Sequence, residues 1–423
     1  MTLTIANAVL EGYADLISIR IRDGRIEAIG PGLEGPEHAP RLDAAGMTVI
    51  PGLVNAHTHA AMTLLRGAGD DLPLMTWLNE RIWPAEARLS EEDVYWGTRL
   101  ACVEMIRSGT VAFQDGYWHV HGMARAVRES GLRVALGLAM VDAQGGEQGD
   151  ACKKAAREFM AQRDPHEDRI QPILFPHAIY SVSPENLRWC ARFADDHGLN
   201  VHIHLSETPW EVNDCLNRHG MRPAFYLDTL GLLHQRSILA HGVFLDDDEL
   251  DLIALRGATL VTNPTSNLKL AVGGIFPHER AAARGIPVGL GSDGAASNNS
   301  LDLFAEMKTF ALIQKHARGD PTAMPAPLAL DIAMGRKAPI LGQTGIIAPG
   351  HPADLLLIRT HECGMVPPLN LASNLVYAAT GAVVDTTIVA GRVLMHHRFV
   401  EGEGEIRREV TARALALTRL HPS

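Results

Sequence analysis

The middle of the chain repeats one pattern, in which a short apolar segment is followed by a segment with the spacing of an amphipathic helix. Eight such apolar segments have the length and composition of buried strands: 48–56, 110–114, 133–140, 170–175, 200–205, 237–240, 258–262 and 287–291. The helical segments carry end markers, as in 183–198, with Ser183 as N-cap, Pro184 at the first helical position and Gly198 as the stop. This alternation predicts an α/β fold, a (β/α)8 barrel of the TIM type over residues 53–348. A doubly wound open sheet is the alternative, but the glycine-rich loop that normally follows its first strand is absent.

The two ends of the chain have a different character, with short segments of alternating apolar and polar residues. "ISIRIRDGRIEAIG" alternates on both sides of Asp23-Gly24, which is a strong hairpin turn. After Pro349, "ADLLLI" and "TTIVAGRVLMHHRFV" read as strands, and the second turns near Gly391. We therefore expect residues 1–52 and 349–423 to form one small β-sandwich domain beside the barrel.

Charge and cysteine content exclude several classes of protein. The formal net charge of -11, without a cluster of lysine or arginine, argues against a nucleic-acid or anionic-membrane partner. The N-terminus lacks a basic start, and no uncharged apolar run approaches the roughly 18 residues of a membrane span. The 5 cysteines are widely spaced, so neither a disulfide framework nor a thiolate zinc site is predicted. We expect a cytoplasmic protein with reduced cysteines.

Histidines and carboxylates gather where the predicted strands end. His57 and His59 stand two residues apart behind the first strand, so both imidazoles point to the same side. The later strands end at further polar residues: His177, His202, His204, Glu207, His241 and Asp293. One such residue alone is more often structural than functional, but the chemistry of a barrel lies at this rim, and the set together predicts a metal site. His202 alternates with His204, so we expect it to face the outer helices or to lie behind the metal ligands, in a structural role.

The spacing around Glu207 indicates the kind of chemistry. Glu207 stands three residues beyond His204, where a carboxylate can take a proton from a metal-bound water and pass it to a substrate. The HExxH signature of metalloproteases and the His-x-Glu with Pro-Cys-x-x-Cys signature of cytidine-type deaminases are both absent. No lysine lies between Lys154 and Lys269 to bridge two ions, so one metal ion per chain is predicted. Imidazole and carboxylate ligands favour zinc, with iron and manganese as alternatives.

Several longer motifs resemble those of a known family. "PGLVNAHTH", "HIHLSET", "LAHG", "NPTSNLKL" and "GSDGAASNNSLDLF" are similar to the amidohydrolase superfamily, in its hydrolytic deaminase branch. "TWLNERIWPAE" and "PHAIYSVSPE" resemble the 5′-methylthioadenosine/S-adenosylhomocysteine deaminases. The resemblance covers nearly the whole chain, including a closing "GIIAPGHPADLLLI".

The resemblance implies a role for each motif residue. His57, His59, His204 and Asp293 would bind one divalent metal ion, most simply zinc. Glu207 would shuttle a proton to the purine ring, His241 would polarise the attacking hydroxide, and Asp293 would help deliver a proton to the leaving ammonia. The family also implies a homodimer.

The resemblance further assigns substrate contacts that the residues alone do not suggest. Glu86 and His177 would contact the ribose hydroxyls, and Trp77 would form an aromatic wall, although by themselves Trp77 reads as core and Glu86 as an exposed helix charge. Asn263, Ser266 and Asn267 are expected to shape the loop after the seventh strand.

One departure from the family concerns the 5′ side of the substrate. Members that use S-adenosylhomocysteine carry two arginines, and the matching positions here are Leu138 and Asp150. The sequence therefore predicts deamination of 5′-methylthioadenosine, 5′-deoxyadenosine or adenosine, with S-adenosylhomocysteine less favoured.

Three other functions were weighed against this one. A deaminase of guanine, a pterin or a triazine is the nearest alternative, although the ribose contacts Glu86 and His177 argue against it. A ring-opening amidohydrolase often needs the bridged pair of ions. A binding scaffold without activity would have lost its ligands.

Overall fold

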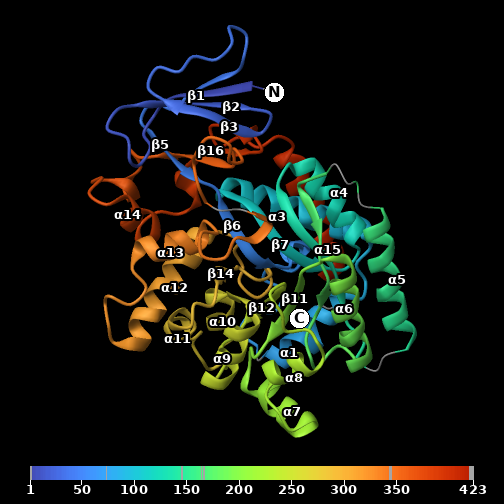
Figure 1. Ribbon diagram of the computed structural model, residues 1–423. Helices are drawn as coiled ribbons and strands as arrows, with labels where there is room; N and C mark the ends of the chain where they lie inside the picture. The colour runs from blue at the N-terminus through green and yellow to red at the C-terminus, as the bar shows by residue number, and fades with distance from the viewer. Residues whose placement is uncertain are drawn as a thin grey trace.

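The structure, a computed structural model, describes residues 2–72, 74–143, 146–162, 164, 167–342 and 345–418 (Figure 1). Its centre is a ring of parallel strands. In chain order these are β6 (Leu53–Thr58), β7 (Thr110–Tyr117), β8 (Arg133–Met140), β9 (Ile170–Pro172) with β10 (Phe175–Pro176), β11 (Val201–Leu205), β12 (Ser237–His241), β13 (Thr259–Thr262) and β14 (Val288–Leu290). All eight predicted strands are present in the predicted order, but the first, predicted at 48–56, is divided at Gly52: β5 (Met47–Pro51) pairs with β15 (Leu355–Arg359) outside the barrel, and β6 belongs to the barrel. The fourth is divided at Ile173–Leu174, although both parts keep one register with β8.

Backbone contacts close the ring. Strands β6, β7, β8 and β10 form one arc, and β11, β12, β13 and β14 form the other. Leu174 pairs with Val201 at one junction. At the other, the N–H groups of Ser292 and Asp293 donate to the carbonyl oxygen of His57 at 3.1 and 3.0 Å. The predicted (β/α)8 barrel is therefore confirmed.

Helices surround the barrel, and the segment that the sequence marks at 183–198 begins and ends as predicted. The main ones are α3 (Glu91–Arg107), α4 (Val120–Ser130), α5 (Glu147–Ala161), α6 (Pro184–His197), α7 (Pro209–His219), α8 (Pro223–Thr229), α9 (Asp247–Arg256), α10 (Pro264–Lys269), α11 (His278–Ala283), α12 (Leu303–Arg318) and α13 (Ala326–Ala333). The Ser183 side chain caps α6, which ends at left-handed Gly198. Asp246 and Glu249 form a capping box on α9. None of the helices in the described ranges is long and apolar enough to cross a membrane.

The two ends of the chain form two four-stranded sheets at one end of the barrel (Figure 1, top). One sheet is β3 (Arg25–Gly30), β2 (Ile17–Arg22), β1 (Thr2–Ala8) and β4 (Arg41–Asp43). The other is β17 (Arg392–Met395), β16 (Val384–Val389), β15 (Leu355–Arg359) and β5 (Met47–Pro51). Ile5, Ile19, Leu357 and Ile388 are fully buried in one core that both sheets share. This arrangement confirms the predicted β-sandwich architecture built from both termini.

The last two helices contact the barrel rather than this apolar core. Helix α14 (Leu371–Tyr377) lies against α12 and α13, and α15 (Glu403–Thr418) lies against α3. Arg413 on α15 donates to Asp93 at the start of α3 over 2.8 Å.

Candidate active site and metal centre

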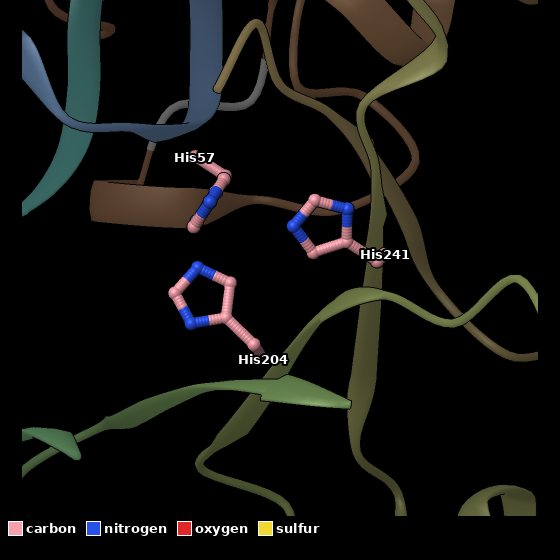
Figure 2. A group of neighbouring side chains, drawn as sticks. All are labelled: His57, His204 and His241. Carbon is pink, nitrogen blue, oxygen red and sulfur yellow. The ribbon is translucent and has the colours of Figure 1, made fainter. Parts of the chain in front are cut away.

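Side chains from separate strands meet at the carboxyl ends of the barrel strands. Nitrogen atoms of His57, His204 and His241 lie within 4.8 Å of one another, and Figure 2 shows the three imidazoles converging from three strands. Ligand atoms of His57, His59 and Asp293 lie equally close together. The structure thus brings all four predicted metal ligands, together with His241, to one place.

The spacing of these atoms suits a tetrahedral metal site. Oδ1 of Asp293 lies 3.4 Å from Nε2 of His57 and 3.4 Å from Nε2 of His59. Nε2 of His59 lies 3.3 Å from Nε2 of His204. Zinc ligands at about 2.0–2.1 Å in tetrahedral geometry are separated from one another by about 3.3 Å. Nε2 of His57 is also buried without a hydrogen-bond partner, as expected for a nitrogen that binds a metal ion.

Hydrogen bonds on the opposite ring nitrogen set the tautomer of two ligands. Nδ1 of His59 lies 2.8 Å from the carbonyl oxygen of Gly116, and Nδ1 of His204 lies 2.7 Å from that of His177. A carbonyl oxygen can only accept, so each Nδ1 carries the proton and each Nε2 presents a lone pair to the site. The donor set therefore fits a divalent ion such as zinc.

Asp293 is oriented by the two segments beside it. The hydroxyls of Ser266 and Ser297 donate to Oδ2 over 2.6 and 2.8 Å, so Oδ1 is turned toward the imidazoles. Its backbone is left-handed, with φ of 59°, at the sharp turn after β14. Burial alone would raise the pKa of Asp293, but the neighbouring His57 and His59 hold it well below its usual value. The carboxylate is therefore ionised, as a metal ligand must be.

Glu207 and His241 face each other beside the ligands. Oε2 of Glu207 lies 3.8 Å from Nε2 of His241. Nδ1 of His241 lies 2.8 Å from Oδ1 of Asn267, and this bond directs Nε2 into the site. Burial raises the pKa of Glu207. Burial would lower the pKa of His241, but Glu207 and Asp293 raise it above its usual value. Such a pair can hold and pass a proton near neutral pH.

Two of the predicted substrate contacts, Glu86 and His177, lie beside the metal ligands, whereas Trp77 is buried in the hydrophobic core. Trp77 is 6% exposed, on the short helix α1 (Leu74–Trp77), and Glu86 is the last residue of α2 (Trp83–Glu86). Glu86 accepts a hydrogen bond of 2.7 Å from the hydroxyl of Tyr117. It is partly buried rather than an exposed helix charge, and burial raises its pKa. The ring of His177 lies 4.7 Å from that of His204, which places it beside the ligands.

The two positions that depart from the family carry no cation. Leu138 is partly buried and packs against the core. Asp150 is exposed on α5 and pairs with Lys153 over 2.8 Å. Gln144 and Gly145, in the middle of "MVDAQGGEQGD", lie outside the described residues.

Sequence reasoning missed several polar residues that support the site. The carboxylate of Glu211 accepts hydrogen bonds from the backbone N–H groups of Ser206 and Glu207 at 2.8 and 2.9 Å, which fixes the turn that carries Glu207. Gln114 lies buried inside β7 and contacts His202. The one hint in the sequence is that Gln114 and Asp115 interrupt an otherwise apolar strand. Ser266 and Asn267 lie on the short helix α10 rather than in a loop, and they orient Asp293 and His241.

A second group of possible ligands lies far from the barrel strands, on β16 and the turn after β17. It consists of Asp385, His396 and His397. Asp385 accepts from the hydroxyl of Thr386 at 2.8 Å and lies 3.3 Å from Nδ1 of His397, while Nδ1 of His396 lies 2.9 Å from the Thr386 hydroxyl. These atoms satisfy one another, so the group needs no ion.

Comparison with known proteins agrees with this geometry. The model of the Amidohydrolase family matches residues 48–394. A 5′-deoxyadenosine deaminase of Methanoregula boonei is 48% identical over 380 residues, covering 89% of this chain and 86% of the relative. A 5-methylthioadenosine/S-adenosylhomocysteine deaminase of Syntrophobacter fumaroxidans is 44% identical over 389 residues, covering 90% and 88%.

A solved structure extends the likeness to the fold. It is an adenosine deaminase from Xanthomonas campestris with bound zinc, 32% identical to this chain, with a TM-score of 0.91 and coverage of 99% of this chain and 98% of that one. The chain therefore belongs to the amidohydrolase family, within its group of 5′-methylthioadenosine/S-adenosylhomocysteine and 5′-deoxyadenosine deaminases.

Proposed function

We propose that this protein is a zinc-dependent aminohydrolase that converts adenine nucleosides to their inosine analogues and ammonia. One observation carries the proposal: imidazole nitrogens and a carboxylate at tetrahedral spacing stand beside Glu207 in a chain 48% identical to a 5′-deoxyadenosine deaminase. His57, His59, His204 and Asp293 would hold one zinc ion per chain. The absence of lysine between Lys154 and Lys269 supports a single ion, because no carbamate bridge can form there.

The bound ion would act as a Lewis acid that lowers the pKa of a water to about 7. Glu207 would take a proton from the attacking water and give it to the ring nitrogen beside the carbon that bears the amino group. His241, held by Asn267 through Nδ1, directs its Nε2 atom at the attacking oxygen and stabilises its charge. Asp293 would accept the second proton of the attacking water and help deliver it to the amino group, which leaves as ammonia.

Three further residues would hold the ribose and the base. Glu86 and His177 contact the ribose hydroxyls, and Trp77 lies over the base. The bond from Tyr117 to Glu86 keeps that carboxylate in place. These contacts favour a nucleoside over guanine, a pterin or a triazine, because a bare ring has no ribose to hold. The single-ion site disfavours a ring-opening amidohydrolase.

The 5′ substituent should be uncharged. A substrate carboxylate would meet Leu138 and the acidic Asp150 where relatives of the family place arginines. The loss of a charge-assisted bidentate contact typically costs about 1.5–3 kcal/mol. We expect kcat/KM for 5′-methylthioadenosine to exceed that for S-adenosylhomocysteine by roughly tenfold to a thousandfold.

An ultraviolet assay of purified protein tests the function. The panel contains 5′-deoxyadenosine, 5′-methylthioadenosine, adenosine, S-adenosylhomocysteine, adenine and guanine, with metal content measured on the same sample. Nucleosides should be deaminated and free bases should be poor substrates, with about one zinc per chain. His204→Ala and Asp293→Ala should lose metal and activity together. Two ions per chain would overturn the single-ion site, and equal kcat/KM for the thioether and homocysteine nucleosides would overturn the assignment of Leu138 and Asp150.

We also propose a homodimer as the assembled form, on the family resemblance. Light scattering coupled to size exclusion tests it, and a mass close to the 45.8 kDa of one chain would contradict it.

A further inference from the structure

Behind the ligand His57, three buried side chains form a continuous file of hydrogen bonds. Nδ1 of His57 lies 2.9 Å from Nε2 of His202, and Nδ1 of His202 lies 2.8 Å from Oε1 of Gln114. All three side chains have a relative exposure of 0%. The file runs across the barrel interior, from β6 through β11 to β7. His202 therefore does not face the outer helices, but lies directly behind a ligand of the metal centre.

Gln114, the last residue of the file, determines in which direction the hydrogen bonds are donated. The amide oxygen of Gln114 can only accept, so Nδ1 of His202 carries a proton. A neutral imidazole with its proton on Nδ1 has a lone pair on Nε2, and Nε2 of His202 must therefore accept from Nδ1 of His57. His57 then has its own lone pair on Nε2, the buried atom without a partner that lies 3.4 Å from Asp293.

If the hydrogen bonds were donated in the opposite direction, His57 could not bind a metal ion. If the Gln114 amide were turned so that its NH2 group donated to His202, the file would reverse and Nε2 of His57 would carry a proton. A protonated Nε2 cannot bind a cation. The other two histidine ligands need no such file, since their Nδ1 atoms donate directly to the carbonyl oxygens of Gly116 and His177.

We propose that His202 and Gln114 are positioning residues that hold His57 in the tautomer required for metal binding. The inference rests on the metal site of the proposed function and assigns residues to it that touch neither metal nor substrate. Partners of this kind fix the ring orientation and tautomer of a metal ligand, and their loss typically weakens metal affinity by about 10–100-fold.

Metal affinity is the first test. Zinc dissociation constants are measured for the full chain by competition with a chromophoric chelator, in wild type, His202→Leu and Gln114→Leu. The matched controls are His278→Leu and Gln314→Leu, which remove a buried imidazole and a buried amide outside the site. We expect about 10–100-fold weaker zinc binding in His202→Leu, a smaller loss in Gln114→Leu, and unchanged affinity in both controls. Unchanged affinity in both site variants would overturn the proposal.

The tautomers themselves are the second test; they are measured in the wild-type protein, and the Gln114→Leu variant serves only to assign the His202 signals. Long-range 1H–15N spectra of zinc-loaded protein labelled at histidine distinguish a proton on Nδ1 from one on Nε2. His202 should carry its proton on Nδ1, and its signals can be assigned through the Gln114→Leu spectrum, where they should shift most. A proton on Nε2 of His202 would overturn the inference.

Failure of the proposed function has a different signature. Wild-type protein that neither binds zinc nor deaminates nucleosides contradicts the function, whereas normal zinc binding in wild type and in both site variants contradicts only the file.

Discussion

Each imidazole at the barrel rim is held through its Nδ1 atom, by a carbonyl oxygen at His59 and His204, by Asn267 at His241 and by His202 at His57. The Nε2 atoms are thereby free to converge. Since a neutral imidazole has one donor and one acceptor, the partner on Nδ1 decides what Nε2 can do. At the scale of single residues, the chemistry of the site is therefore set by the atoms behind it.

Glu207 is the residue whose chemistry can be separated most cleanly from binding. Glu207→Gln keeps the size of the side chain but cannot accept the proton, and Glu207 is not among the proposed metal ligands. We expect zinc content and substrate binding to persist while kcat falls by about 10²-fold or more. Metal analysis and steady-state kinetics measure both, with Glu185→Gln, an exposed carboxylate on α6, as the control. A Glu207→Gln enzyme with more than about a tenth of wild-type turnover, a barrier change below about 1.4 kcal/mol, would exclude Glu207 as the proton carrier.

At the scale of elements, helix α12 supports the segments that carry Asp293 and Ser266. Its buried residue Glu306 accepts from the backbone N–H of Thr265 at 3.1 Å and from the side-chain amide of Asn298 at 2.7 Å. One carboxyl group thus links the segments after β13 and β14 to a helix of the outer layer. Burial raises its pKa to about 7.

This raised pKa predicts a pH dependence of stability. In the unfolded chain Glu306 loses its proton near the ordinary glutamate pKa of 4.5, whereas burial raises the pKa to about 7 in the folded chain. The folded state binds the extra proton between these values, so its stability falls as pH rises through that window. The contribution over the whole window is about 3 kcal/mol.

Replacing Glu306 with a residue that does not titrate tests this pH dependence of stability. Glutamine does not titrate, so the variant lacks this pH dependence. The difference in unfolding free energy, wild type minus Glu306→Gln, should therefore fall from pH 5 to pH 7.5. Urea titrations at several pH values measure this difference, and the metal ligands, which are common to both proteins, cancel in it. Glu409→Gln, on α15, serves as the control for the same substitution at a carboxylate that is 45% exposed. A pH-independent difference for Glu306→Gln would contradict the raised pKa.

At the scale of the whole molecule, a buried ion pair joins the barrel to the terminal sheets. Nε of Arg133, at the start of β8, donates to Asp354, just before β15, over 2.9 Å, and the side chains are 9% and 3% exposed. The other oxygen of Asp354 accepts from the backbone N–H of Ala390 at 2.6 Å. We propose residues 1–52 with 349–423 and residues 53–348 as the two domains, and this pair lies at their junction.

Breaking this pair should destabilise the molecule. Asp354→Asn removes the buried partner of the Arg133 guanidinium and leaves it the exposed carboxylate of Asp168, 3.7 Å from Nη1, so we expect the unfolding free energy to fall by about 3 kcal/mol. Asp228→Asn is the matched control, because its partner Arg256 is 45% exposed and such a pair contributes about 0–1 kcal/mol. Urea unfolding measures both. Equal small losses in the two variants would show that the junction does not depend on Arg133 and Asp354.

The sequence alone determined the barrel, since its strands are apolar, its helices carry their own caps and the alternation of the two repeats eight times. The Asp23–Gly24 turn pairs Arg22 with Arg25, as local chemistry predicts. The sequence also placed the metal ligands at one rim, because parallel strands in a barrel end on the same side.

Tertiary structure decided what depends on pairing between distant segments. His57 and His202 are 145 residues apart, and their hydrogen bond follows from the strand order that closes the barrel rather than from any local pattern. The sequence left two places open for His202, facing the outer helices or lying behind the metal ligands, and the structure puts it behind His57. Residues 202 and 204 are two apart on β11, so their side chains share one face of the strand. Glu86 likewise reads as an exposed charge on a short helix until Tyr117, 31 residues later, donates to it from the end of β7. Local sequence specifies which elements form, whereas the partner of a buried polar atom is set only when those elements pack.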